Sequence, residues 1–172
     1  IEHGEADAIV SGLTANYPEF LRPALRMFGK SANDQAVVGL DILMTKKGPL
    51  FFADTMVNLE PDVKTIVDIT LQTANTVRRF GIEPKIALLS YSNFGSVKGS
   101  VPFKMRDAVS ILHRDYPGLL VDGDIQGNFA INKELVKEAF PFSKLIDGPA
   151  NTLIFPNLAA SHISFRLLKE GG

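Results

Sequence analysis

Apolar runs of strand length alternate along this chain with longer segments whose apolar residues recur at helical spacing. The longest helical segment begins near Pro61 and ends at Phe80-Gly81, and its apolar residues return every three or four positions. Because strands joined through helices run parallel, the alternation predicts an α/β fold: a three-layer α/β/α arrangement whose mostly parallel sheet is covered on both faces. One hairpin is expected, because turn-forming residues 46–49 join two β-rich runs at 37–45 and 50–54.

The same patterns place the other elements. Further strands are expected at residues 8–11, 85–90, 119–121 and 151–155, and further helices at 17–28, 103–116, 133–139 and 158–169. Asn16 is expected to cap the first of these helices, and Gly29 to stop it. No internal repeat or linker divides the chain, so one domain or slightly more is expected.

Two of the expected strands end abruptly in small, polar or turn-forming residues. In an open α/β sheet, ligands bind in the crevice beyond the carboxyl ends of the strands. Residues 90–96, called the serine loop below, offer hydroxyls, backbone N–H groups and Gly95, which lets the backbone approach a phosphate. Lys98 and Lys104 lie near this loop in sequence, and Lys104 is expected to open the next helix, whose N-terminal dipole favours an anion. The alternative is an ordinary polar turn after a strand.

Carboxylates follow two other strands. Asp54 is expected to line the ligand crevice, and Asn58 either lines it as well or caps the next helix. Asp122 and Asp124, followed by Gln126, end another strand. Two carboxylates could bind a metal, but no His, Cys or third carboxylate lies nearby in sequence. A polar rim of the site is therefore favoured, and no metal is expected.

The composition excludes several classes of function. The 172 residues carry a net charge of −1, so no surface for nucleic acid or an anionic membrane is expected. The absence of cysteine excludes disulfides, thiolate metal sites and a thiol nucleophile. No membrane span or signal peptide is apparent, so a cytoplasmic protein is expected. His113 is expected at the surface. His162 is of more interest, because it follows the strand that ends at Phe155-Pro156-Asn157-Leu158.

A family pattern is spread over nearly the whole chain. Its segments are ADAIVSG at 6–12, PLFFADTMVN at 49–58, FGIEPK at 80–85, ALLSYSNFGS at 87–96, VDGDIQ at 121–126, GPAN at 148–151 and LIFPNL at 153–158. Together they resemble the phosphate acetyl/butyryltransferase (phosphotransacetylase) family, and most closely the phosphotransacetylase-like C-terminal domain of bacterial NADP-dependent malic enzymes. The serine loop and Thr55 resemble the malic-enzyme branch, because free phosphotransacetylases more often carry Ser-Thr-Lys-Gly-Ser in that loop.

The resemblance implies a two-domain fold of the isocitrate/isopropylmalate dehydrogenase type, in which CoA and phosphate bind between the domains and the subunits dimerise. The matching positions implied to face that cleft are Ser90, Ser92, Asn93, Gly95, Ser96, Asp122, Gln126, Phe155, Pro156 and Asn157. The residues alone add Asp54, Asn58 and Lys104 as candidate contacts of an acyl-CoA or a phosphate.

The departures from the family pattern matter as much as the matches. Active members carry a Ser-Arg pair and a carboxylate downstream of the final helix, and a further arginine in an N-terminal lobe. The family's Asn-Thr-Gly-Asn reads Ala159-Ala160-Ser161-His162 here, and a common aspartate is replaced by Asn128. We therefore expect residues 1–157 to form the cleft side of one lobe and residues 158–172 a helix that leads to an absent second lobe. No catalytic residue and no catalysis by this fragment alone are expected.

Three functions fit this resemblance. The first is an acetyl-CoA-responsive regulatory and oligomerisation module of a malic enzyme, which converts malate to pyruvate with NADP and Mg²⁺ or Mn²⁺ held in another region. The second is the catalytic lobe of a phosphate acyltransferase, which converts acetyl-CoA and phosphate to acetyl phosphate and CoA. The third is an oligomer interface that binds nothing. The first is favoured, with no cofactor in the chain itself.

Overall fold

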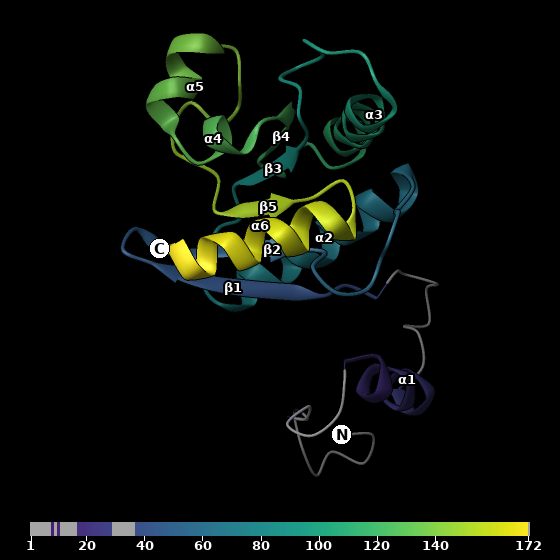
Figure 1. Cartoon of the computed structure of the whole chain (residues 1–172). Coiled ribbons are helices and arrows are strands. Elements are labelled where there is room, and N and C mark those ends of the chain that lie inside the picture. Colours follow the sequence, from purple (N-terminus) through teal and green to yellow (C-terminus); the bar gives the residue numbers. More distant parts are fainter. Residues whose placement is uncertain (1–7, 9, 11–16, 29–36, 172) are drawn as a thin grey trace. The chain divides into compact units, whose positions relative to one another are not determined.

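A sheet of five strands forms the centre of residues 37–171 (Figure 1). The strands are β1 (Leu40–Thr45), β2 (Gly48–Ala53), β3 (Ile86–Leu89), β4 (Val121–Ile125) and β5 (Thr152–Ile154), in the spatial order β1-β2-β5-β3-β4. This computed structural model describes Ala8, Val10 and residues 17–28 and 37–171. β1 and β2 run antiparallel, whereas β2, β5, β3 and β4 are parallel neighbours. The expected mostly parallel sheet with one hairpin is confirmed.

Residues 1–35 and 36–172 form two units, and each is described by itself. The first unit contains the expected helix, α1 (Tyr17–Phe28). The expected strand at 8–11 and the helix boundaries Asn16 and Gly29 fall outside the described residues. Ala8 and Val10 are the exceptions, and neither belongs to a strand.

The hairpin turns through Lys46-Lys47. Thr45 Oγ1 donates to the Gly48 carbonyl over 2.7 Å, and Gly48 has a φ of +114°, which suits glycine. β1 begins at Leu40 rather than at residue 37. The reason is that the Val37 carbonyl and the Gly39 N–H bond to side chains of the loop after β2.

Helices cover both faces of the sheet. One face carries α2 (Val63–Arg79) and α3 (Ser100–Asp115), and the other carries α4 (Gly127–Ala130), α5 (Lys133–Ala139) and α6 (Leu158–Gly171) (Figure 1). Successive residues of β3 alternate between the two apolar cores: Ile86 faces α2 and α3, and Ala87 faces the opposite layer. A strand buried on both faces is apolar throughout, which explains the continuous apolar runs in the sequence.

α2 has clear boundaries. The Asp62 side chain accepts a hydrogen bond from the Thr65 N–H over 2.8 Å at the N-terminus, and Gly81, with a φ of +73°, follows the last turn. Its buried residues are Ile66, Val67, Ile69, Thr70, Thr73, Ala74 and Val77. The expected apolar face is confirmed, with Val63 half-buried at its margin.

The expected boundaries of α3 and β4 are also wrong, and one short helix was not expected. α3 begins at Ser100 rather than at residue 103, so Lys104 lies in its second turn and does not open it. β4 covers residues 121–125 rather than 119–121, although aspartate and glycine disfavour strands. Asp122 and Asp124 are tolerated there because each finds buried hydrogen-bond partners. The short helix α4 was not expected.

Candidate functional site

The candidate residues meet at one edge of the sheet. Because β2, β5, β3 and β4 are parallel, their carboxyl ends lie at the same edge. Asp54 follows β2, Phe155 follows β5, Ser90 follows β3 and Gln126 follows β4. The loops predicted to hold a ligand are therefore neighbours in space.

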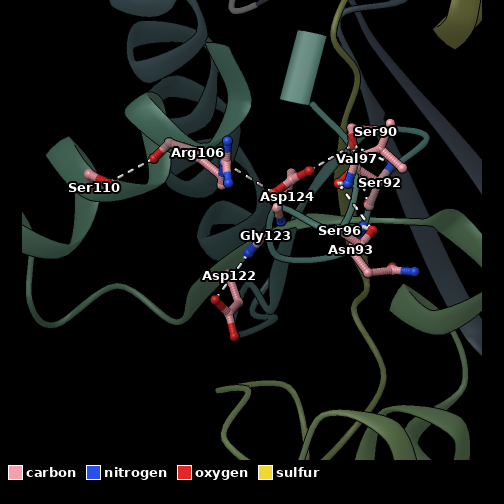
Figure 2. Close-up of polar contacts among 11 residues, drawn as sticks. Ser90, Ser92, Asn93, Ser96, Val97, Arg106, Ser110, Asp122, Gly123 and Asp124 are labelled. Atoms are coloured by element: carbon pink, nitrogen blue, oxygen red, sulfur yellow. Dashed lines mark hydrogen bonds and ion pairs between the residues drawn. The ribbon is translucent and has the colours of Figure 1, made fainter. Parts of the chain in front are cut away.

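The serine loop is closed by its own hydrogen bonds (Figure 2). Within the loop, the Ser92 N–H donates to Ser90 Oγ (2.8 Å), the Asn93 N–H to Ser96 Oγ (3.0 Å), the Ser96 N–H to the Asn93 carbonyl (3.0 Å) and the Val97 N–H to Ser92 Oγ (3.1 Å). Two more N–H groups donate to Asp124: Phe94 to its carbonyl (2.6 Å) and Gly95 to its Oδ1 (3.1 Å). These N–H groups are therefore not free to cradle a phosphate, contrary to the expectation. A ligand at this loop would therefore be held mainly by side chains.

The hydroxyls of Ser92, which is buried, and Ser96, which is exposed, are hydrogen-bonded to each other. Ser92 is fully buried, and its Oγ accepts from the Val97 N–H and lies 3.3 Å from Ser96 Oγ. Either hydroxyl can donate to the other, and a bond donated by Ser92 to Ser96 Oγ gives the buried hydroxyl proton an acceptor. Ser96 is exposed and also accepts from the Asn93 N–H, so in that arrangement its own hydroxyl proton has no partner within the loop. The Ser96 hydroxyl is thus available as a donor to a ligand.

Asp124 organises this loop from below. Its carboxylate is fully buried; Oδ2 accepts from Ser90 Oγ over 3.0 Å and Oδ1 accepts from the Gly95 N–H over 3.1 Å. The Arg106 Nε lies 3.7 Å from Oδ1 and supplies a nearby positive charge (Figure 2). A buried carboxylate is tolerated only when it is hydrogen-bonded and paired, and Asp124 meets both conditions. It therefore fixes the loop conformation.

Arg106 was not singled out from the sequence. Its guanidinium lies against Gly95, where a Cβ would stand 2.0 Å from Nη1, and its Cζ lies 4.8 Å from the centre of the Phe103 ring. Gly95 is needed twice, since its φ of +85° also disfavours other residues. On sequence spacing, Arg106 looks like an ordinary cation on a helix surface. Its proximity to the loop depends on α3 folding back beside it, and no sequence motif indicates that.

Asp122 and Asp124 do not form one polar rim. Asp122 accepts from Ser143 Oγ and the Lys144 N–H, each over 2.7 Å, and so holds the segment after α5 rather than the serine loop. The two carboxylates diverge at Gly123, where the φ is +144° and the β3–β4 register shifts (Figure 2). The expected shared rim is therefore wrong for Asp122, which is buried with its own partners.

Asn93 and Gln126 lock the serine loop to the end of β4. The Gln126 N–H donates to Asn93 Oδ1 over 2.8 Å, and Gln126 Nε2 donates to the Tyr91 carbonyl over 2.9 Å. Phe94, whose φ is +48°, turns its ring away to pack 5.1 Å from the Phe140 ring. Both predicted polar residues are thus at the site, and both position the loop.

Asp54 and Asn58 form a second closed loop. The Asp54 carboxylate accepts backbone N–H bonds from Gly39 (3.0 Å), Met56 (2.9 Å), Val57 (3.1 Å) and Asn58 (2.8 Å). The Asn58 side chain donates to the same carboxylate and to the Val37 carbonyl. Asn58 does not cap α2, because Asp62 does. These two residues hold the loop after β2 in place, and their polar side-chain atoms are hydrogen-bonded in doing so.

The segment after β5 also positions structure. The Phe155 ring stacks 5.7 Å from the Phe52 ring in the core. Asn157 Oδ1 accepts from the Ala160 N–H over 2.9 Å and caps α6. One turn further on, the Ser161 hydroxyl donates to the Asp54 carbonyl over 2.5 Å and ties α6 to the loop after β2.

Lys104 connects two of these loops. Its Nζ donates to the carbonyls of Pro61 and Pro156, each over 2.9 Å, and Glu60 lies 4.0 Å away. The side chain is largely buried. Lys104 therefore lies at the predicted edge, but it contacts the loops around β2 and β5 and not the serine loop.

An open groove lies beside the start of α6. It has a volume of about 440 Å³ and is lined by Leu59, Glu60, Leu158, Ala159, His162 and Ile163. The groove includes His162, a residue of interest from the sequence, but none of the serine-loop residues. His113, expected at the surface, is half-buried, and its Nε2 lies 2.7 Å from the Val121 carbonyl.

Within the described part of the chain, no three His, Cys, Asp or Glu side chains gather where they could hold a metal ion. The same residues include no helix with both the length and the apolar character needed to cross a bilayer.

The fold and the loops define an α/β protein whose candidate site residues lie at the carboxyl edge of its parallel strands. The chain matches, over residues 1–172, the family described as phosphate acetyl/butaryl transferase, and it belongs to that family. The resemblance seen in the sequence is confirmed.

Relatives in this family come from two kinds of enzyme. The chain is 40% identical over 169 residues to the NADP-dependent malic enzyme of Escherichia coli (strain K12), covering 98% of this chain and 22% of that protein. It is 37% identical over 170 residues to the phosphate acetyltransferase of Buchnera aphidicola subsp. Schizaphis graminum, covering 99% of this chain and 24% of that protein. The solved phosphotransacetylase of Streptococcus pyogenes matches with a TM-score of 0.88 at 32% identity, covering 99% of this chain and 52% of that one. The chain thus spans less than a quarter of these two relatives.

Proposed function

We propose that this chain binds an acyl-CoA and a phosphate-type group at the carboxyl edge of its sheet, beside the serine loop. The family match over residues 1–172 is the observation that carries the proposal. The site geometry supports it, because the buried Asp124 carboxylate fixes a loop that presents the Ser96 hydroxyl outwards. Side-chain donors in a fixed arrangement suit recognition of an oxyanion.

The parent protein that we propose is an NADP-dependent malic enzyme, in which this domain responds to acetyl-CoA and helps to assemble the oligomer. The malic-enzyme relative at 40% identity and the Asn93-Phe94 pair in the serine loop support this assignment. NADP and Mg²⁺ or Mn²⁺ would then be held in another region of the protein. The proposal includes a cytoplasmic location.

A second candidate is the catalytic lobe of a phosphate acetyl- or butyryltransferase. The Buchnera relative at 37% identity and the phosphotransacetylase structure from Streptococcus pyogenes favour it to a similar degree. Either parent agrees with a two-domain architecture of the isocitrate/isopropylmalate dehydrogenase type. In that architecture residues 1–157 supply one side of the cleft and residues 158–172 begin the return to a second lobe.

The start of α6 distinguishes the two candidates chemically. The family's polar Asn-Thr-Gly-Asn is replaced by Ala159-Ala160-Ser161-His162, and the Ser161 hydroxyl is spent on the Asp54 and Leu158 carbonyls. Ala159 and His162 line the open groove. Loss of polar groups at this position favours ligand sensing over acyl transfer, because transfer needs donors that stabilise the oxyanion.

Two assays on the intact protein test this proposal. We expect acetyl-CoA to change the rate of malate oxidation, followed as NADPH absorbance, and we expect no acetyl phosphate to form from acetyl-CoA and phosphate. Rapid acetyl phosphate synthesis with no malate oxidation would instead establish the transferase. If acetyl-CoA neither binds in calorimetry nor affects either reaction, the domain is not an acyl-CoA site.

A further inference from the structure

Most backbone donors of the serine loop are already hydrogen-bonded, so a nearby cation would strengthen the binding of an anion beside it. Every N–H group from residue 92 to residue 97 is hydrogen-bonded within the loop or to Asp124. Phe94, at the tip of the loop, carries no charge and packs into an aromatic cluster with Phe140 and Phe142. The neighbouring cations in the described chain are Lys98, which is exposed, and Arg106.

We propose that Arg106 is the residue that contacts the anionic group of the ligand, through its Nη atoms, at the face of the loop marked by Gly95. This inference rests on the proposed phosphate-type ligand and names the residue that recognises it. The ligand group is a phosphate or phosphoester oxyanion, because the planar guanidinium fork matches two oxygens of such a group.

The first support is the position of the guanidinium. Nη1 occupies the space that a Cβ of Gly95 would fill, at 2.0 Å from it, so the fork lies directly on the loop backbone. The side chain is 31% exposed, so part of it is open to solvent. Phe103 supports the guanidinium from below at 4.8 Å, so the side chain is held in place before a ligand arrives.

The second support is that the Arg106 donors are uncommitted. A guanidinium has five N–H donors. Nε lies 3.7 Å from Asp124 Oδ1, which is an ion-pair distance and too long for a hydrogen bond. In the described chain, no residue accepts a hydrogen bond from Nη1 or Nη2. If Arg106 only neutralised Asp124, we would expect a bidentate pair, with two short N–H···O hydrogen bonds from the guanidinium to the carboxylate.

The binding experiment uses the intact protein and three probes: inorganic phosphate, acetyl phosphate and CoA, each measured by calorimetry. Arg106→Gln should weaken binding of the recognised probe about 10- to 100-fold, as expected for the loss of charge-assisted hydrogen bonds. Arg106→Lys should recover only part of the affinity, because it keeps the charge but not the fork. Arg78→Gln is the matched control: Arg78 is exposed, pairs with Glu83 at 3.3 Å and should leave binding unchanged. Equal affinity of wild type and Arg106→Gln would overturn the inference.

A second variant separates ligand contact from neutralisation of Asp124. In an Asp124→Asn variant the buried negative charge is gone. If Arg106 served only to neutralise that charge, adding Arg106→Gln would then cause no further loss of affinity for the probe. A persisting loss of affinity on adding Arg106→Gln supports direct contact, and a vanishing loss overturns it.

A measurement on the wild-type protein does not depend on the variants folding. Phenylglyoxal modification, followed by mass spectrometry, should be slowed at Arg106 by saturating probe and unchanged at Arg114, whose side chain is 71% exposed. Equal protection, or none, overturns the inference. If phosphate protects Arg106 while CoA does not bind, the inference stands and the acyl-CoA proposal fails. If CoA binds without involving Arg106, only the inference fails. If no probe binds, both fail.

Discussion

The buried carboxylates at this site hold neighbouring loops in place through hydrogen bonds. Asp54, Asp122 and Asp124 are all buried, and each accepts hydrogen bonds from a segment that follows it or packs beside it. Burying a carboxylate without partners costs several kcal/mol, so each of these positions is tolerated because its oxygens are satisfied. Their satisfied state also means that a ligand would have to displace protein hydrogen bonds to reach them. Recognition of an anion therefore falls to serine hydroxyls and to cations.

Asp54→Asn should destabilise the fold. Each oxygen of Asp54 accepts N–H bonds, so either orientation of an asparagine amide would turn its NH₂ group towards N–H donors. We expect a loss of about 1–3 kcal/mol in the free energy of unfolding, measured by urea denaturation. Asp107→Asn, at an exposed position of α3, is the control and should change stability by less than about 0.5 kcal/mol. An equal effect of both variants would show that the Asp54 hydrogen bonds contribute nothing.

Ser96→Asp should lower affinity for acetyl-CoA and leave the fold intact. The position is exposed, and a carboxylate there would repel the anionic ligand and compete with it for the Arg106 cation. The expected cost is about 1–3 kcal/mol, or roughly 5- to 150-fold in affinity by calorimetry on the intact protein. Asn75→Asp, exposed on α2, adds the same charge away from the loop and should have little effect. Unchanged affinity in Ser96→Asp would place the ligand elsewhere.

At the scale of elements, the sequence predicts correctly those helices and turns that are determined by interactions between residues close together in the chain. The hairpin follows from the turn at residues 46–49, and α2 follows from its cap, its periodicity and Gly81. β4 was placed too early because Asp-Gly-Asp disfavours a strand, and its carboxylates are satisfied by residues about 20 and 30 positions away. The closed serine loop was missed for the same reason: its geometry depends on Asp124 and Arg106, which no local pattern connects to it.

The N-cap of α2 gives a prediction for pH dependence. Hydrogen bonds from the Thr65 side chain and then its N–H lower the pKa of Asp62 below its usual range. A lowered folded-state pKa stabilises the protein above the ordinary value of about 4, and this contribution is lost as the pH falls through the lowered pKa. Asp62→Ala should therefore cost about 0.5–2 kcal/mol at pH 7 and less below pH 4.

The matched comparison for that prediction is Asp62→Asn. Asparagine caps a helix without titrating, so its advantage over alanine should stay constant with pH. Thermal unfolding of the three proteins between about pH 2 and 7 measures both differences. A cost of Asp62→Ala that does not fall at low pH would show that the charge of Asp62 does not contribute.

At the scale of the whole molecule, α6 exposes several large apolar side chains. Phe165 packs 5.4 Å from the Phe52 ring, but Ile163, Leu167 and Leu168 are 59%, 69% and 41% exposed. Helical spacing spreads these four side chains over much of the circumference of α6, so they cannot all face one core. Ile163 and Leu167 are four residues apart and so lie on one face, which continues to Leu59 across the open groove.

The double variant Ile163→Glu and Leu167→Glu should weaken association of the intact protein. A contiguous apolar face of this kind is covered by another subunit or another part of the protein, and a carboxylate buried there without a cation costs several kcal/mol. If the face joins subunits, the dissociation constant measured by sedimentation velocity should rise by about 100-fold or more, while circular dichroism stays unchanged. If it joins another part of the same chain, the oligomer should persist and the unfolding midpoint should fall by several degrees. Leu135→Glu, at an exposed position of α5, is the control. Wild-type association and wild-type stability in the double variant would together show that this face packs against nothing.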